Sequence, residues 1–526
     1  MKKHIAAGWR YVRYGRIVLG WIVMSTFLLG FLGVVNASAL ARWQLLPALL
    51  AGNVLAVTVL VLLTLCFGRV YCSVLCPLGL WQDFVSYLAE RRKGGRRRYA
   101  YRQESWKLRY GVLAVLASGL LGGAAAIPLL LDPYTIFGRI ATHLFAPAIH
   151  SGANQLIRWQ IAYDGPDLGL AHTDVVTFGT TAVLVAAAYL IVISLVAWRY
   201  GRLYCQAFCP VGTLLGTVSR HAVLQLHFGT DCISCGLCAK SCPSSCIDVP
   251  HHRIDASRCI DCFTCVSVCP KGALAFGRPS KETITTSNAG STQNLPNASR
   301  QPGESDNPNQ PNAAPSLTRR QMIAGSALAT LAAAGALTKG ARGTALAAAP
   351  EKVVRPPGAL SYATFSERCT GCHLCVASCP QGILRPANLE YGLGGIFQPR
   401  LDFTDGYCDP ACTRCSDICP AGAITPVAPE KKKTLKIGTA LYRPDTCVIL
   451  TEGRTCGHCA EVCPIHAIEM ADDGNGHLLP KVHHRRCIGC GSCEYHCPAQ
   501  PKAIRVAGKE EQTIVQTNGQ FGRGKK

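Results

Sequence analysis

The sequence predicts a multidomain protein in which an α-helical bundle of four membrane spans, with a further signal-anchor segment, carries small α+β domains on both sides of the membrane. The composition supports a membrane protein, because 49% of the 526 residues are apolar and only 16% are charged. Thirty cysteines are present, and 24 of them fall into six groups of four with short internal spacing. Such groups are typical of metal ligands, and iron–sulfur ligation is the natural interpretation.

Four apolar segments, each about 20 residues long, predict the membrane bundle, because this length crosses the hydrocarbon core of a bilayer. They cover residues 17–35, 45–67, 110–131 and 175–198. Basic residues gather before the first segment and between the second and the third, where ten Lys and Arg lie from Arg69 to Arg109. By the positive-inside rule, both ends of this four-helix unit are cytoplasmic.

A repeated motif follows the second and the fourth apolar segments. FGRVYCSVLCPLG covers residues 67–79 and YGRLYCQAFCPVG covers 200–212. A repeat at equivalent places predicts a pseudo-two-fold arrangement, and in a helix the two cysteines of each motif share one face. The repeat therefore predicts one more cluster at the cytoplasmic membrane surface; a thiol set without metal is the alternative. The predicted ligands are Cys72, Cys76, Cys205 and Cys209.

Two cysteine groups after the fourth span have the spacing of bacterial ferredoxins. CISCGLCAKSCP at 232–243 and CIDCFTCVSVCP at 259–270 both read C-x2-C-x2-C-x3-C-P. In this pattern three cysteines bind one [4Fe–4S] cluster and the fourth binds its neighbour, whereas zinc is the less favoured alternative. The predicted ligands are Cys232, Cys235, Cys238 and Cys269 for one cluster, and Cys259, Cys262, Cys265 and Cys242 for the other.

An export signal is predicted in the middle of the chain. Residues 278–316 are rich in Ser, Asn, Pro and Gly, which predicts a disordered cytoplasmic linker. Arg319 and Arg320 then precede a weakly apolar segment and a small-residue stretch at 345–347, as in a twin-arginine signal. Such a signal exports folded proteins, so clusters loaded in the cytoplasm would cross the membrane intact. We expect the signal to stay uncleaved as a fifth membrane segment; a coincidental Arg-Arg pair before an Ala-rich linker is the alternative.

Four further cysteine groups follow the signal, and each ends in Cys-Pro. The outer two have the standard spacing and the middle two are stretched. This favours an exchange of fourth cysteines between the first and fourth groups and between the second and third, with sequential pairing left open. The chain thus holds six predicted [4Fe–4S] clusters, or seven with the repeated motif. The groups are Cys369, Cys372, Cys375 and Cys379; Cys408, Cys412, Cys415 and Cys419; Cys447, Cys456, Cys459 and Cys463; and Cys487, Cys490, Cys493 and Cys497.

These motifs resemble a known pair of proteins. Residues 1 to about 277 resemble the NapH-like membrane ferredoxin-type subunit of periplasmic nitrate reductase systems. Residues 317–508, with RPPGAL at 355–360, resemble the exported NapG-like or MauM-like four-cluster partner. The resemblance implies a quinol dehydrogenase of the bacterial inner membrane that passes electrons from the quinol pool to a periplasmic redox protein or to a molybdenum or multihaem reductase. The two parts are normally separate polypeptides and are fused here, which leaves the terminal acceptor open.

A maturation or regulatory electron donor for another protein's metal centre is the alternative function.

The predicted domains follow from these assignments. Residues 225–316 are expected in the cytoplasm and 351–526 in the periplasm. The domains are 1–224 (membrane bundle), 225–277 (two-cluster ferredoxin), 278–316 (linker), 317–350 (signal-anchor), 351–508 (four-cluster ferredoxin) and 509–526 (basic tail).

Other cofactors and partners have little support in the sequence. The four apolar segments contain no His, which removes the ligands for a bis-histidine haem, and no nucleotide-binding fingerprint is present. Much of the net charge of +22 lies in the predicted cytoplasmic loops, so it reflects topology rather than nucleic-acid binding. Cys66 and Cys246 fall outside every motif and are expected to pack as apolar side chains.

The quinol site is predicted only as a set of candidates. Quinol oxidation needs a proton acceptor beside an apolar slot, and the predicted outward segment 132–174 offers such groups. The alternative, which we favour, is that these residues cap a re-entrant or interfacial helix. The candidates are Asp132, Tyr134, Arg139, His143 and His150.

Overall fold

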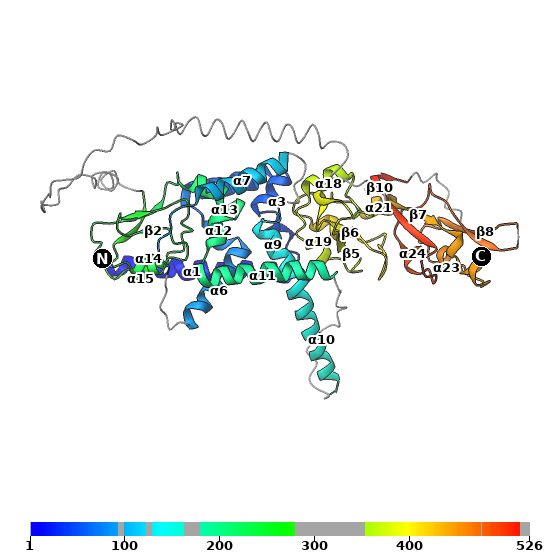
Figure 1. Ribbon diagram of the computed structural model, residues 1–526, viewed down its shortest axis with the longest axis horizontal. Coiled ribbons are helices and arrows are strands. Elements are labelled where there is room, and N and C mark those ends of the chain that lie inside the picture. The colour runs from blue at the N-terminus through cyan, green and yellow to red at the C-terminus, as the bar shows by residue number, and fades with distance from the viewer. Residues whose placement is uncertain are drawn as a thin grey trace, which may run out of the picture.

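The computed structural model describes residues 2–92, 99–121, 129–162, 179–278, 353–474 and 476–515, and the account below concerns these residues. The signal-anchor at 317–350 and the linker beyond Arg278 lie outside them. Figure 1 shows an elongated molecule with one ferredoxin-like unit at the end where α1 begins, a helical bundle in the middle, and further small units toward the other end.

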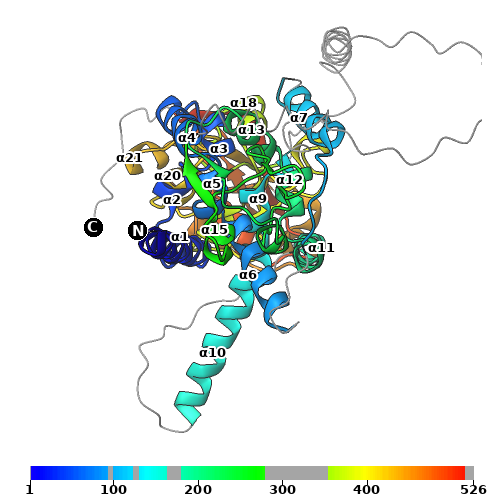
Figure 2. The same ribbon diagram turned by 90° about the vertical axis from the view of Figure 1, so that its left-hand side faces the viewer.

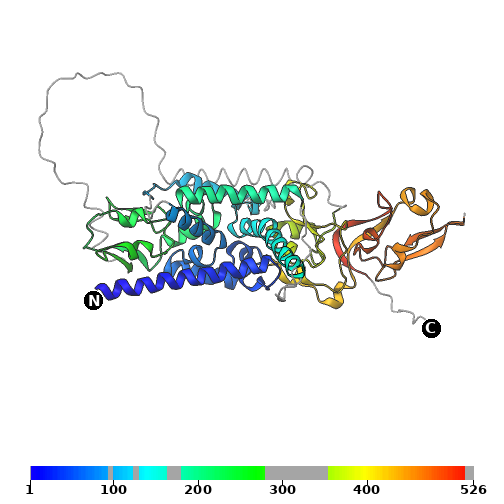
Figure 3. The same ribbon diagram turned by 90° about the horizontal axis from the view of Figure 1, so that it is seen from below.

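The bundle contains long helices and several short ones. Figure 3 shows α1 and α11 running along the long axis, with ferredoxin-like units beyond both ends of the bundle. The long and medium helices are α1 (Lys2–Phe31), α4 (Val54–Phe67), α6 (Pro77–Arg92), α7 (Trp106–Leu121), α10 (Ala146–Ala162) and α11 (Thr180–Tyr200). The short ones are α2 (Ser38–Ala41), α3 (Leu45–Leu50), α5 (Val70–Val74), α9 (Pro133–Ile140), the π-helix η1 (Ala141–Phe145), α12 (Leu203–Ala207) and α13 (Pro210–Ser219).

Within the described residues, two helices are long and apolar enough to cross a membrane, Tyr11–Phe31 and Thr180–Tyr200. The predicted span at 45–67 is wrong as a single helix, since it is divided into α3 and the shorter α4. Gly52 adopts a left-handed φ of 68°, and the Asn53 side chain accepts a hydrogen bond from the Ala56 N–H at 3.1 Å. These two residues end one helix and cap the next. The predicted third span is described only up to Leu121, in α7.

The ferredoxin-like units are built from two-stranded antiparallel sheets and helices of one or two turns. Six of the short helices each contain the third cysteine of a group. The sheets pair β1 (Gln225–Phe228) with β4 (Leu274–Gly277), β2 (Ile247–Asp248) with β3 (Arg253–Ile254), β5 (Leu384–Pro386) with β6 (Pro399–Leu401), β7 (Leu435–Tyr442) with β10 (Ile504–Ile514), and β8 (Ile468–Asp472) with β9 (Leu478–Val482). The helices are α14 (Leu237–Lys240), α15 (Thr264–Val268), α18 (Tyr362–Arg368), α19 (Leu374–Ala377), α20 (Arg414–Ile418), α21 (Pro429–Lys432), α22 (Val448–Thr451), α23 (His458–Glu461) and α24 (Ser492–Tyr495), with 3-10 turns η2 (Leu393–Gly395) and η3 (Pro444–Thr446).

Strand β10 also corrects a predicted boundary. Residues 509–514 were expected to begin a basic tail, but they continue β10, and Thr513 and Ile514 pair with Lys436 and Leu435 of β7. The last unit therefore extends beyond residue 508. Its remaining predicted tail, 516–526, lies outside the described residues.

Helix α1 contacts the units at both ends of the bundle. Near its start, Trp9 stacks on Phe263 with ring centroids 5.0 Å apart, and Arg13 donates a hydrogen bond to Ser267 at 2.7 Å. Near its end, Phe31 packs against the α9 residue Phe137 with ring centroids 6.1 Å apart. One helix thus holds the first ferredoxin-like unit at one end and the α9 segment at the other.

Candidate iron-sulfur sites and their junctions

The two cysteine groups of the first ferredoxin-like unit exchange their fourth members. One pocket, with about 370 Å³ of empty volume, is lined by the first three cysteines of one group and by Cys269 of the other. A second pocket is lined by Cys259, Cys262, Cys265 and Cys242. The geometry matches the ligand sets predicted from the spacing. The second pocket also contains Cys246, which sequence reasoning assigned to packing.

Among the four groups after residue 353, the first pairs with the second and the third with the fourth, so the favoured pairing of first with fourth and second with third is wrong. Cys379 of the first group joins Cys408, Cys412 and Cys415, and in return Cys419 interacts electrostatically with Cys369 and Cys372. Cys463 and Cys497 are exchanged in the same way between the third and fourth groups. The long spacing from Cys447 to Cys456 is filled by the single-turn helix α22 and a loop, so it does not change the partner.

The thiols surround pockets rather than meeting at a point. Across the described ranges, no three His, Cys, Asp or Glu side chains could hold a single metal ion. Several sulfurs also accept backbone hydrogen bonds, for example Cys269 from Ala273 at 3.3 Å and Cys463 from Ala467 at 3.2 Å. N–H groups aimed at sulfur stabilise cluster-bound thiolates and tune their potential. The donor sets therefore fit multi-iron clusters.

The repeated motif forms a seventh set of four cysteines inside the molecule. Cys72, Cys76, Cys205 and Cys209 are only 3–4% exposed and interact electrostatically with one another. The structure buries them in the bundle core, and their position at the cytoplasmic membrane surface stays a prediction. Proline at the start of α6 and α13 follows the second cysteine of each motif, which fixes the two halves in the same local conformation.

Two buried arginines link the halves of the repeat. Arg202 donates to the carbonyl oxygen of Cys72 at 2.6 Å, and Arg69 donates to the carbonyl oxygen of Cys205 at 3.3 Å. Each motif thus holds the cysteine backbone of the other, as a pseudo-two-fold arrangement requires. Arg69 also lies 3.5 Å from Cys72 Sγ, and Gln82 donates to Cys205 Sγ at 3.2 Å. Both guanidiniums therefore place positive charge beside the sulfurs of this set.

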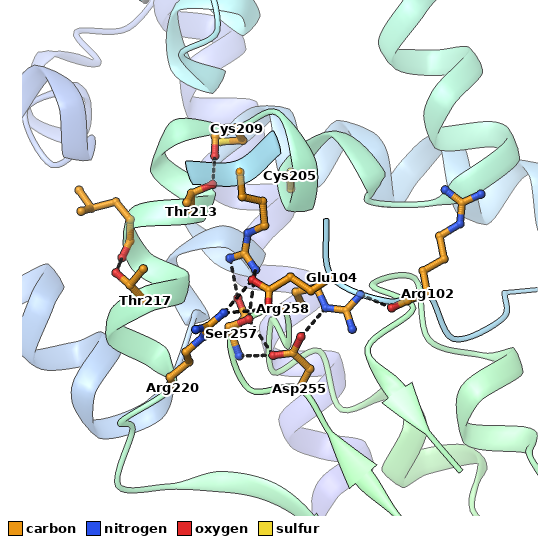
Figure 4. A network of polar contacts seen from close by, with 12 residues as sticks. Arg102, Glu104, Cys205, Cys209, Thr213, Thr217, Arg220, Asp255, Ser257 and Arg258 are labelled. Carbon is orange, nitrogen blue, oxygen red and sulfur yellow. Dashed lines mark hydrogen bonds and ion pairs between the residues drawn. The ribbon is translucent and has the colours of Figure 1, made fainter. Parts of the chain in front are cut away.

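A polar network joins the seventh set to the first ferredoxin-like unit (Figure 4). Arg69 donates to the carbonyl oxygen of Ser257 at 3.0 Å, and Asp255 accepts from the Ser257 hydroxyl at 2.7 Å. Arg258 pairs with Asp255 at 2.5 Å and also donates to the carbonyl oxygen of Arg102 at 2.6 Å. Because Ser257 precedes Cys259 by two residues, this network positions the second cysteine pocket against the repeat.

At the other end of the bundle, α9 and η1 meet the Cys369 loop. Arg139 donates to the carbonyl oxygen of Gly371 at 3.1 Å and stacks over the Phe397 ring at 4.7 Å. His143 Nε2 lies 2.7 Å from His373 Nδ1. His373 Nε2 lies 2.8 Å from the carbonyl oxygen of Phe397, which only accepts, so this nitrogen carries a proton. In a neutral His373 ring, Nδ1 then accepts from His143.

Four of the five quinol candidates lie at this end of the bundle. Asp132, Tyr134, Arg139 and His143 are each at most 3% exposed, whereas His150 lies on α10, which projects from the body in Figure 1 and Figure 2. Asp132 caps α9 by accepting from Thr135 N–H at 2.8 Å, as the capping alternative predicts. Burial raises the pKa of Asp132 to about 6, and burial, with Arg139 nearby, lowers the pKa of His143 to about 3.

The seven sets form one row. Asp261 lies between Cys259 and Arg69, and Arg69 contacts Cys72. Tyr134 and Asp132 then lie between the repeat and the Cys372 loop, since both interact electrostatically with cysteines of that loop, and Tyr204 beside Cys205 interacts with Asp132. Further along, the Cys408 N–H donates to the carbonyl oxygen of Cys490 at 2.8 Å, which joins the unit of the first two groups after residue 353 to the unit of the last two. The units that contain the sets and the bundle follow one another along the long axis of the molecule (Figure 1).

Comparisons with known proteins agree with these sites. A 4Fe-4S binding domain model matches residues 49–96 and 180–230, which contain the two halves of the repeat. A 4Fe-4S dicluster domain model matches residues 231–273, 407–467 and 453–501, and another 4Fe-4S binding domain model matches 363–385. The overlapping matches at 407–467 and 453–501 show why spacing alone does not decide the pairing, and the structure agrees with the second. The fold and these sites define an iron–sulfur electron-transfer protein of the ferredoxin type.

Comparison with individual relatives identifies the family within this class of proteins. The chain is 37% identical to the methylamine utilization ferredoxin-type protein MauM of Methylophilus methylotrophus over 168 residues, 30% of this chain and 72% of the relative. It is 33% identical to MauM of Paracoccus denitrificans over 204 residues, 36% of this chain and 87% of the relative. The ferredoxin-type protein NapG of Escherichia coli is 31% identical over 163 residues, 29% of this chain and 69% of the relative. The chain belongs to this family of ferredoxin-type proteins.

Proposed function

We propose that this protein carries electrons from the membrane quinol pool to a periplasmic redox partner through [4Fe–4S] clusters, of which the chain holds seven. The observation that carries the proposal is the unbroken row of seven cysteine sets from the Cys232 pocket to the Cys447 pocket. Four thiols in each set fit a [4Fe–4S] cluster, which supplies one-electron chemistry when bound. The chain supplies the ligands, the hydrogen bonds to sulfur and the contacts that keep neighbouring sets close.

The seventh cluster rests on the repeat. The 4Fe-4S binding domain model matches both halves, and each half contributes two motif cysteines, so a four-thiol site requires both. Arg202 is paired with Asp83 at 2.7 Å, whereas Arg69 is buried beside Cys72 Sγ and two carbonyl oxygens, and buried charge is stabilised by a partner of opposite sign. A cluster with four thiolate ligands is such a partner. It also fills the position between the first ferredoxin-like unit and the exported units.

A membrane location places the two ends of the row in different compartments. The two apolar helices Tyr11–Phe31 and Thr180–Tyr200 run along the bundle, and the units lie beyond its ends. We propose a multi-pass protein of the bacterial inner membrane with residues 225–316 in the cytoplasm and 351–526 in the periplasm. The twin-arginine segment fits this arrangement, because it precedes the units that would be exported.

Quinol would deliver its electrons where α9 meets the Cys369 loop. Asp132, Arg139 and His143 are buried there beside the fourth set in the row. Quinol oxidation releases protons as well as electrons, and a carboxyl with a pKa of about 6 is suited to accept one. The periplasmic acceptor in this proposal is a redox protein, or a molybdenum or multihaem reductase; the relatives include proteins named for methylamine utilization, which leaves the acceptor open.

Purified full-length protein is expected to contain about 28 iron atoms, four for each of seven clusters, and to be reduced rapidly by a menaquinol analogue. Iron analysis and the loss of cluster absorbance measure the two properties. An iron content near 24 atoms per chain would show that the seventh set binds no cluster. Slow reduction by quinol, with fast reduction by a cytoplasmic low-potential donor, would favour the alternative role as an electron donor for another protein's metal centre.

Exchange of Arg319 and Arg320 for lysine is expected to keep the four exported clusters in the cytoplasm. Lysine preserves the charge but not the paired guanidiniums that define the signal. Protease added to spheroplasts should digest residues 351–526 of the wild type and leave this variant intact. The matched control is Arg342→Lys, the same exchange outside the pair. Equal digestion of both variants would contradict the assignment.

A further inference from the structure

A fifth cysteine lines the second pocket of the first ferredoxin-like unit. Cys246 is 1% exposed, and its Sγ lies 3.6 Å from Sγ of Cys242. It also interacts electrostatically with Cys259, and both cysteines line the same pocket. The pockets described around Cys232, Cys408, Cys447 and Cys487 contain four cysteines each.

The local chain holds this thiol in place. After Cys242, the Ser245 N–H donates to the carbonyl oxygen of Cys242 at 3.0 Å, and Ser245 adopts a left-handed φ of 48°. This turn directs Cys246 back toward the pocket. The carbonyl oxygen of Cys246 then accepts from the Asp255 N–H at 2.9 Å, and β2 begins at the next residue. The Cys246 backbone is therefore fixed on both sides.

We propose that Cys246 is a fifth thiol of the second cytoplasmic cluster: it donates an S–H hydrogen bond to the Cys242 sulfur and replaces Cys242 as a ligand when Cys242 is lost. This rests on the proposed cluster at Cys242, Cys259, Cys262 and Cys265. Thiolates that bind iron carry no proton, so Cys246 is the one cysteine of the pocket able to donate.

The hydrogen bond has a definite electronic effect. Reduction of the cluster adds negative charge, part of which lies on the ligand sulfurs. An S–H dipole directed at Cys242 stabilises that charge and raises the reduction potential, because hydrogen bonds to the sulfurs are among the factors that set it. This cluster lies next to the repeat through Asp261 and Arg69, so Cys246 adjusts the potential at the junction of the two parts.

The first test is a redox titration of full-length protein followed by electron paramagnetic resonance. Cys246→Ala is expected to lower the midpoint potential of one cluster by about 59 mV, a tenfold change in the ratio of oxidised to reduced cluster for one electron. Cys246→Ser, which keeps a donor, should restore much of the shift, and Cys66→Ala serves as a control outside every set. Unchanged midpoint potentials in Cys246→Ala, with the iron content retained, would contradict the proposed hydrogen bond from Cys246 to Cys242.

The second test counts iron and needs no quinol, so it is independent of the proposed direction of electron flow. Cys242→Ala should retain its cluster because Cys246 replaces the ligand, whereas Cys242→Ala with Cys246→Ala should lose about four iron atoms. The matched control is Cys269→Ala, the corresponding fourth cysteine of the other group, whose pocket has no fifth thiol among the described residues. Equal iron loss in the Cys242 single and double variants would overturn the replacement role. Loss of iron in Cys246→Ala alone would show a structural role instead.

Discussion

Replacement of Cys205 by serine is expected to remove one cluster and to stop electron transfer between the first ferredoxin-like unit and the units after residue 353. Cys205 lies in the middle of the row, where its set is the one bridge between the Cys259 pocket and the Cys369 loop among the described sites. Serine is a poor ligand for iron, and the described part of the chain offers no fifth thiol in this set to replace it. Iron analysis should show about four fewer atoms per chain.

The effect on electron flow is separable from the effect on folding. In the variant, a reductant that acts on the first ferredoxin-like unit should still reduce its two clusters, while the four clusters after residue 353 should stay oxidised. Cys66→Ser is the matched control, because Cys66 is exposed, lies near the same motif and belongs to no set. An unchanged iron content in Cys205→Ser would show that the repeat does not bind a cluster.

Gly138→Ala is expected to slow electron transfer into the exported clusters strongly while every cluster still assembles. Gly138 lies in α9 where a Cβ would collide with the carbonyl oxygen of Cys372 and with the ring of Phe31. One contact is a backbone atom of the cluster loop, so the loop must move away to make room. The rate of electron transfer falls steeply with distance, so displacement of the Cys369 loop is expected to slow the transfer of electrons to the cluster of the Cys369 set first.

The control for this prediction is Gly152→Ala. Gly152 lies in α10, where an added Cβ meets nothing within 4 Å, and the same exchange raises helix propensity at both positions. Rapid-mixing measurements with a quinol analogue should show a normal rate for Gly152→Ala and a reduced rate for Gly138→Ala, both with about 28 iron atoms. Equal rates would mean that electrons do not pass through this junction.

The ligand chemistry was readable from the sequence. In the spacing C-x2-C-x2-C-x3-C-P, three cysteines within a few residues bind the same cluster, so each group specifies most of its own site locally. The repeated motif could also be recognised from the sequence, since matching residues at equivalent places predict two halves with the same local structure. Arg69 and Arg202 could be identified in that repeat from the sequence. The sequence did not show that each arginine donates to the cysteine backbone of the other half.

The tertiary structure decided which distant segments meet. The fourth cysteine of each group binds a neighbour, and the identity of that neighbour depends on long-range packing, such as the pairing of β7 with β10 that encloses the last two groups. The meeting of His143 with His373 and of Cys246 with Cys242 depends on packing or turn geometry in the same way. Local spacing fixes how a loop encloses a cluster, because it involves a few consecutive residues. It does not fix what lies beside that loop, because packing is decided by side chains far apart in the chain.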